Sequence, residues 1–79
     1  MTHDEALRFT TDILLKHVER ETIKPTDHIQ NDLELDSLGV MEVIADIEDH
    51  FGIEIPSELL SKLATVDDVA KAIVTIKKA

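Results

Sequence analysis

The sequence predicts an all-α fold, a small bundle of three longer helices and one short helix that forms a single domain over residues 1–79. Apolar residues recur with the helical period of 3.6, and no stretch has the strict alternation that is typical of a strand. A chain of 79 residues can bury one small core, without a catalytic cavity of any size. Two glycines, two prolines and no cysteine exclude a repeat array, a flexible linker and a disulfide framework.

The first helix is expected from about Asp4 to Val18, because acidic side chains at its start suit the positive end of the helix dipole. The polar segment from Glu19 to Asn31 contains a proline and predicts a long, ordered loop. The apolar positions of the helix are Leu7, Phe9, Ile13, Leu14 and Val18, and the expected anchors of the loop are Ile23 and Ile29.

The second helix is expected from about Ser37 to Phe51, with Asp36 as its N-cap and Gly52 just after its C-terminus. At about 100° per residue its apolar side chains fall in one sector, which is the predicted core face. The core face consists of Val40, Val43, Ile44, Ile47 and Phe51; Leu38, Glu42, Ala45 and Asp49 lie opposite, with Met41 and Asp46 on the flanks.

After an extended link over Ile53 to Pro56, Ser57 is expected to cap a short helix that carries Leu59, Leu60 and Leu63. Thr65 followed by Asp68 has the spacing of a capping box and predicts the start of the last helix. Its inward residues are Val66, Val69, Ala70, Ile73 and Ile76, and Lys71, Lys77 and Lys78 lie toward its C-terminus.

Charge is concentrated in the middle of the chain. Seventeen acidic against eight basic residues give a net charge of −9, and residues 25–61 contain no Lys or Arg. Such a field repels nucleic acid and anionic membranes and attracts basic protein surfaces, although it is equally consistent with an acidic face kept for solubility. With no tryptophan or tyrosine, the chain also lacks platforms for stacking bases. We therefore expect no nucleic-acid partner.

The N-terminal region contains acidic residues and no apolar run, so we expect neither a signal peptide nor membrane insertion. Together with the absence of cysteine, this predicts a monomeric domain of a reducing, cytoplasmic compartment.

No metal site is expected. His3, His17, His28 and His50 are far apart and have no partner at ligand spacing. Asp32, Glu34 and Asp36 resemble the opening of an EF-hand loop, but the sixth position is Ser37 instead of Gly and the twelfth is Val43 instead of Glu. Loose binding of divalent cations to the acidic middle stays open.

Catalysis by the chain alone is not expected. No G-x-S-x-G motif surrounds Ser37, which argues against a small hydrolase, and the carboxylates lie on the face opposite the core. Ser37 does lie at the first turn of a helix, where free N–H groups and the helix dipole favour a covalently attached phosphate. On this basis alone it is equally an ordinary helix residue.

The order of three motifs decides between these alternatives. Asp32 to Leu38 (D-L-E-L-D-S-L), then Phe51 to Pro56 (F-G-I-E-I-P) and Thr65 to Val69 (T-V-D-D-V) resemble the acyl carrier protein family. The resemblance implies that a phosphopantetheinyl transferase attaches 4′-phosphopantetheine from coenzyme A to Ser37, beside Asp36 and Leu38. The thiol of that arm would carry acyl groups as thioesters.

The resemblance also implies partners, namely acyl-loading, condensing or transferring enzymes with basic patches that meet the second helix. Each partner would bind weakly and with strong salt sensitivity, because exposed charge pairs contribute little. The partner-facing residues would be Glu42, Asp46 and Asp49, with Leu38 and Met41 as apolar contacts. The acyl chain would lie among the second, third and last helices. Val40, Ile44, Leu63 and Ile73 are candidates for its lining, although an ordinary core position is the preferred interpretation for them.

Two residues depart from the family pattern, Glu34 where glycine is common and Gly39 where aspartate is common. They favour a stand-alone carrier in a specialised pathway (polyketide, modified-lipid or aminoacyl assembly) and leave fatty acid synthesis open. A D-alanyl or aminoacyl carrier is one alternative. An acidic protein-docking module without any prosthetic group is the other.

Overall fold

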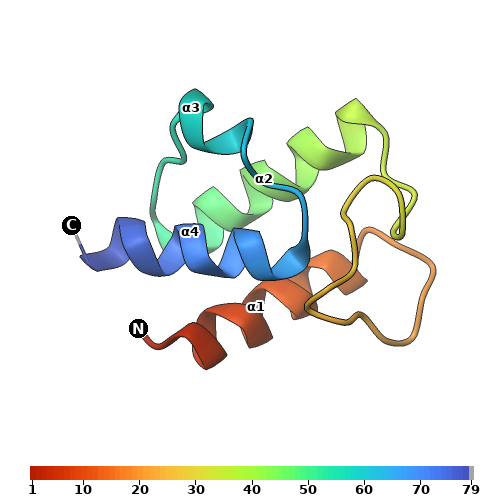
Figure 1. Cartoon of the computed structure of the whole chain (residues 1–79), viewed down its shortest axis with the longest axis horizontal. Helices are drawn as coiled ribbons and strands as arrows, with labels where there is room; N and C mark the ends of the chain where they lie inside the picture. Colours follow the sequence, from red (N-terminus) through yellow and green to blue (C-terminus); the bar gives the residue numbers. More distant parts are fainter. Residues whose placement is uncertain (79) are drawn as a thin grey trace.

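The computed structural model describes residues 1–78, which form four helices (Figure 1). These are α1 (His3–Leu15), α2 (Ser37–Phe51), α3 (Ser57–Leu60) and α4 (Val66–Lys78). No strand occurs within these residues; the β-type pairing among them is one isolated antiparallel bridge between His28 and Thr65. The predicted all-α class, with three longer helices and one short helix, is confirmed.

Helix α1 begins with a reciprocal cap. The Glu5 amide donates to the Thr2 hydroxyl, and the Thr2 amide donates to the Glu5 carboxylate, which lowers the pKa of Glu5. The helix ends at Leu15, three residues before the expected Val18. It stops early because the next two amides, at positions 16 and 17, donate to carbonyls three residues back and close a tighter turn.

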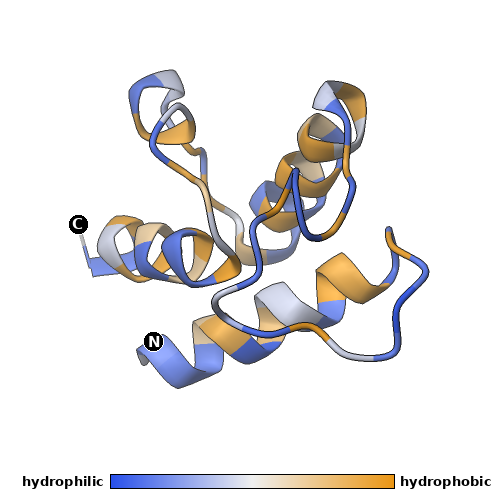
Figure 2. Cartoon of the chain, turned by 45° about the vertical axis from the view of Figure 1, so that its right-hand side comes forward, coloured by the Kyte–Doolittle hydropathy of each residue, from blue (hydrophilic) through white to orange (hydrophobic). Residues whose placement is uncertain are grey.

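The core lies where α1 crosses α4 and, less extensively, α2. The buried residues of these helices are almost all apolar, and Figure 2 shows apolar and polar residues alternating along each helix as bands of orange and blue. Ala6 and Thr10 are completely buried in this core, whereas Phe9 is partly exposed at its edge and packs against Phe51. The most deeply buried large side chains are Leu14, Ile47, Ile73, Val43, Val66 and Val69.

The loop between α1 and α2 is tied to the start of α4. Ile29 is buried, and its amide donates to the Ala64 carbonyl at 2.9 Å. The Val66 amide donates in turn to the Asp27 carbonyl at 3.1 Å. The loop is therefore ordered and anchored by Ile29, as its sequence predicts.

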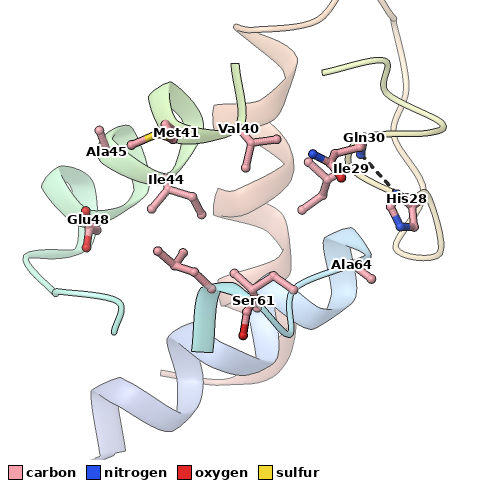
Figure 3. Close-up of a pocket in the computed structure, with 12 residues that line it drawn as sticks. His28, Ile29, Gln30, Val40, Met41, Ile44, Ala45, Glu48, Ser61 and Ala64 are labelled. Atoms are coloured by element: carbon pink, nitrogen blue, oxygen red, sulfur yellow. Dashed lines mark hydrogen bonds between the residues drawn. The ribbon is translucent and has the colours of Figure 1, made fainter. Parts of the chain in front are cut away.

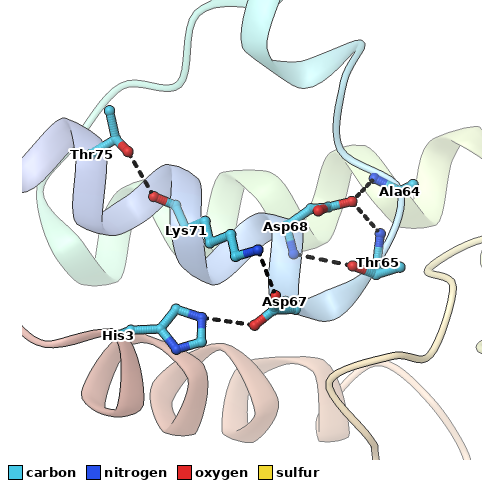
Figure 4. Close-up of polar contacts among 7 residues, drawn as sticks. All are labelled: His3, Ala64, Thr65, Asp67, Asp68, Lys71 and Thr75. Carbon is cyan, nitrogen blue, oxygen red and sulfur yellow. Dashed lines mark hydrogen bonds and ion pairs between the residues drawn. The ribbon is translucent and has the colours of Figure 1, made fainter.

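The two C-terminal helices begin differently. Ser57 is the first residue of α3 and makes no capping bond, so its predicted role as N-cap is wrong; Pro56 occupies that position. Before α4 the predicted capping box is present (Figure 4), since Thr65 N donates to Asp68 Oδ2 at 3.0 Å and Asp68 N donates to Thr65 Oγ1 at 3.2 Å. The neighbouring Asp67 pairs with His3 and Lys71.

Both ends of the chain lie on one side of the molecule, and the first turn of α2 lies on the other (Figure 1). Helices of residues 1–78 lack the combined length and hydropathy that a membrane crossing requires.

Candidate functional site

Ser37 is the first residue of α2 and is exposed. Its helix is capped by Asp36, whose Oδ1 accepts from the Gly39 amide at 2.7 Å, and the first helical bond runs from Val40 N to Asp36 O. The amides of Ser37 and Leu38 precede that bond and have no intrahelical partner at the positive end of the helix. No acidic side chain lies in the first turn of α2. This turn therefore suits an anionic group attached to the serine.

The two departures from the family pattern have visible consequences next to this turn. Glu34 has a φ of 56°, and within residues 1–78 it is the one residue other than glycine with a positive φ. The left-handed conformation costs a residue with a side chain about 1–2 kcal/mol, which explains why glycine is common at this position. A Cβ atom at Gly39 would lie 3.1 Å from Leu35 Cδ2 and 3.2 Å from Asp36 Oδ1. Because glycine has no Cβ atom, both side chains can pack closely against its backbone.

The exposed face of α2 brings together the residues that sequence analysis assigned to partners. Leu38 and Met41 are 67% and 69% exposed, unusually high values for large apolar side chains. Glu42, Asp46 and Asp49 are also exposed on this helix. We refer to Leu38, Met41, Glu42, Asp46 and Asp49 together as the α2 face.

One member of the α2 face is already engaged. The Asp46 carboxylate lies 2.6 Å from Nε2 of His17, just beyond α1, and so links the two helices. Sequence reasoning missed this pair because the two residues are 29 positions apart and no local pattern connects them.

A pocket of about 530 Å³ lies between α2, α3 and the loop (Figure 3). Of the four residues that sequence analysis left between pocket lining and core, Val40, Ile44 and Leu63 line the pocket. Ile73 is completely buried in the core and does not line it. The wall that sequence analysis missed comes from loop residues 28–30, which the bonds to Ala64 and Val66 hold against the helices. The full lining is His28, Ile29, Gln30, Val40, Met41, Ile44, Ala45, Glu48, Leu60, Ser61, Leu63 and Ala64.

Most of the pocket wall is aliphatic, and its polar groups have partners elsewhere. Glu48 Oε2 accepts from the Ile55 amide at 2.7 Å, and the Ser61 hydroxyl donates to the Glu58 carbonyl at 2.9 Å. The Nδ1 atom of His28 accepts from two amides of its own loop. A guest in this pocket would meet a mainly apolar surface.

Acidic and imidazole groups are dispersed in the described part of the chain. No three of them gather closely enough there to hold a metal ion. His3 and His17 each pair with one aspartate, Asp67 and Asp46 respectively.

Comparison with known proteins identifies similar chains. The family described as "Phosphopantetheine attachment site" matches residues 14–73. An acyl carrier protein from Chloroherpeton thalassium is 39% identical over 80 residues, covering 99% of this chain and all of that protein. One from Lactobacillus johnsonii is 35% identical and covers 92% and 94% of the two chains. The solved structure of an acyl carrier protein from Enterococcus faecalis, 35% identical, superposes with a TM-score of 0.79 over 96% of this chain and 99% of that one.

Proposed function

The chain belongs to the acyl carrier protein family, and from this premise we propose that Ser37 carries its prosthetic group. Members of the family bear a covalently attached 4′-phosphopantetheine, whose thiol holds acyl groups as thioesters. They are carriers and not enzymes, and they interact with a phosphopantetheinyl transferase and with acyl-handling enzymes.

One observation carries the proposal: an exposed serine opens α2, and the next turns of the same helix line the pocket. Ser37 lies at the positive end of the helix dipole, where a phosphodiester is stabilised. Asp36 supports this role by capping the helix, because its carboxylate accepts from the Gly39 amide. The exposed Leu38 side chain provides an apolar surface next to the serine. The serine and the pocket wall are therefore carried by the same helix, with Val40 of the lining three positions after Ser37.

The pocket supports a finer proposal about the cargo. Its aliphatic lining and engaged polar groups would bury a reduced, apolar acyl chain favourably, at about 25 cal/mol per Å² removed from water. An aminoacyl group such as D-alanyl would bury much less apolar surface in the same space. We therefore favour a fatty-acyl or modified-lipid cargo over the D-alanyl and aminoacyl alternatives.

The α2 face is the proposed recognition surface. Its three carboxylates attract a basic patch on an enzyme electrostatically, and its two exposed apolar side chains add a small hydrophobic contact. Each exposed ion pair contributes about 0–1 kcal/mol, so complexes form quickly and dissociate readily. A carrier that visits several enzymes in turn requires this.

Intact mass after incubation with coenzyme A, Mg²⁺ and a promiscuous phosphopantetheinyl transferase tests the attachment site. The chain should gain one phosphopantetheine group, and Ser37→Ala should gain none. Ser57→Ala is the matched control, because Ser57 is also exposed at the first position of a helix. Modification of Ser37→Ala would refute the assignment. Failure of the unaltered chain to gain mass would favour the acidic docking module.

Loading the modified chain with octanoyl or alanyl thioesters tests the cargo. The octanoyl group should shift the methyl NMR signals of Val40, Ile44 and Leu63, which line the pocket, and the alanyl group should leave them unchanged. The methyl group of Ile73 is the control, since it lies in the core away from the pocket. Equal shifts with both cargoes would contradict the preference for an apolar chain.

A further inference from the structure

His28 forms a cap within the loop that walls the pocket. Its Nδ1 atom accepts hydrogen bonds from the amides of Gln30 at 3.3 Å and Asn31 at 3.2 Å. In return, the His28 amide donates to Asp32 Oδ2 at 2.6 Å, and two further amides, those of Asp32 and Leu33, donate to the His28 carbonyl. A capping box normally uses a serine or threonine hydroxyl as its acceptor, and here an imidazole nitrogen takes that role.

A ring nitrogen can accept a hydrogen bond only while it carries no proton. The cap therefore requires the neutral tautomer with its proton on Nε2. Protonation turns Nδ1 into a donor, and the two turn amides then face a donor instead of an acceptor. Histidine side chains take up this proton between about pH 8 and pH 5.

We propose that His28 is a positioning residue for the cargo pocket and that its cap opens as the pH falls. The ring holds the amides of Gln30 and Asn31, and Gln30 lines the pocket together with His28 itself and the intervening Ile29. When the ring is protonated, Nδ1 no longer accepts and the amides of Gln30 and Asn31 are released. The link to the cargo rests on the proposed carrier function, but the cap itself does not.

The charged groups around His28 are otherwise engaged. Arg20 donates to the Asp32 carbonyl and pairs with Asp27. On the segment bridged to His28, Asp67 pairs with His3 and Lys71, and Asp68 accepts from the amides of Ala64 and Thr65. Glu48 is the one charged group that α2 contributes to the pocket lining, and it accepts from Ile55. The Asp32 carboxylate is engaged as well, because its Oδ2 accepts from the His28 amide at 2.6 Å.

The test uses the unmodified chain, so that its outcome does not depend on Ser37. At pH 8 the ¹⁵N spectrum should identify the His28 tautomer with the proton on Nε2. Between pH 8 and pH 5 the amide signals of Gln30 and Asn31 should move together with the His28 ring signals. His28→Asn keeps an acceptor oxygen near the position of Nδ1 but cannot be protonated, so its two amides should not respond to pH. His28→Ala should resemble the acid form of the unaltered chain at every pH.

Melting temperatures give a second readout. From pH 7.5 to pH 5.5 the unaltered chain should lose about 4 °C more than His28→Asn. His50→Asn is the control for general histidine titration, because His50 packs against Phe9 and Phe51 at a distance from the loop, and it should retain the response of Gln30 and Asn31. A proton on Nδ1 at pH 8, or an equal pH response in His28→Asn, would overturn the proposal. Failure of the mass test alone would remove only the link to cargo.

Discussion

Helices α1 and α4 pack against each other over their length, whereas α2, α3 and the loop surround a pocket. The first region buries Ile73, Val69 and Leu14 with almost no exposed surface. The second keeps Leu60 and Leu63 only half-buried and leaves Leu38 exposed. The difference indicates that the α1–α4 contact, together with the inner side of α2, supplies most of the stability and that the pocket side is less tightly packed.

The largest expected effect is the loss of stability when a core side chain is truncated, and it tests whether the two regions differ in packing. Ile73→Ala should cost about 2–5 kcal/mol in the free energy of unfolding, because it opens a cavity in the packed α1–α4 pair. Leu60→Ala, at the pocket, should cost about 1 kcal/mol, since that side chain already borders empty space. Urea unfolding measures both, with Ile73→Val as a milder core variant. Equal losses would mean that the two regions do not differ in packing.

The packed region contains one unfavourable group, which offers a way to strengthen it. Thr10 is fully buried in α1, and its hydroxyl has no hydrogen-bond partner in the described residues. Thr10→Val replaces that hydroxyl with a methyl group of similar size and should stabilise the fold by about 1 kcal/mol. The stabilisation should appear as a higher urea midpoint with an unchanged slope. A loss of stability would indicate that the hydroxyl has a partner in solution.

Acid should weaken the start of α4 through Asp68. The amides of Thr65 and Ala64 donate to its carboxylate and lower its pKa below the ordinary value of 3.8. The stabilisation is therefore present above about pH 4 and is lost as the pH falls through the lowered pKa. Asp68→Ala should cost about 1 kcal/mol at pH 7 and flatten this part of the acid limb. An unchanged acid limb in circular dichroism would contradict the assignment.

On the pocket side, Glu34 is the strained residue before α2. Glu34→Gly should remove the cost of the left-handed backbone, although glycine also gains freedom in the unfolded chain. The net result should be a stabilisation of about 0.5 kcal/mol, measured by thermal unfolding. Glu34→Ala is the control, since it removes the charge and retains the strain; equal stabilisation by both would assign the effect to charge.

The last prediction concerns partner recognition and is measured as a change in reaction rate. Glu42→Lys combined with Asp49→Lys should lower the rate of modification by a phosphopantetheinyl transferase about fivefold and reduce its dependence on salt, while helicity is unchanged. Asp46 is left intact because it holds His17. Glu19→Lys with Glu21→Lys makes the same change in net charge away from α2. Equal losses in both pairs would assign recognition to total charge and not to the α2 face.

Local signals predicted much of this structure. The period of apolar residues, Asp36 and Gly52 gave the bounds of α2 as the structure has them, and the pairing of Thr65 with Asp68 marked the start of α4. These features depend on residues close in sequence, where capping and periodicity act directly. The exposed serine and the α2 face follow from the same helical geometry.

The features that escaped prediction depend on contacts between distant segments. The pocket wall from residues 28–30 exists because the loop bonds to Ala64 and Val66. Ile73 shares its helical face with core residues, and only the packing of α1 against α4 decides that it is sealed from the pocket. The positive φ of Glu34 could have been inferred from the glycine common in the family, whereas a histidine cap has no established sequence signature.

The position of the two chain ends has a practical consequence for handling the protein. Because both lie on the side opposite the first turn of α2, an affinity tag or a bead attached at either end leaves Ser37 turned toward bulk solution. Immobilised protein should therefore accept its prosthetic arm as readily as free protein, and enzymes could be delivered to it one after another in a flow cell.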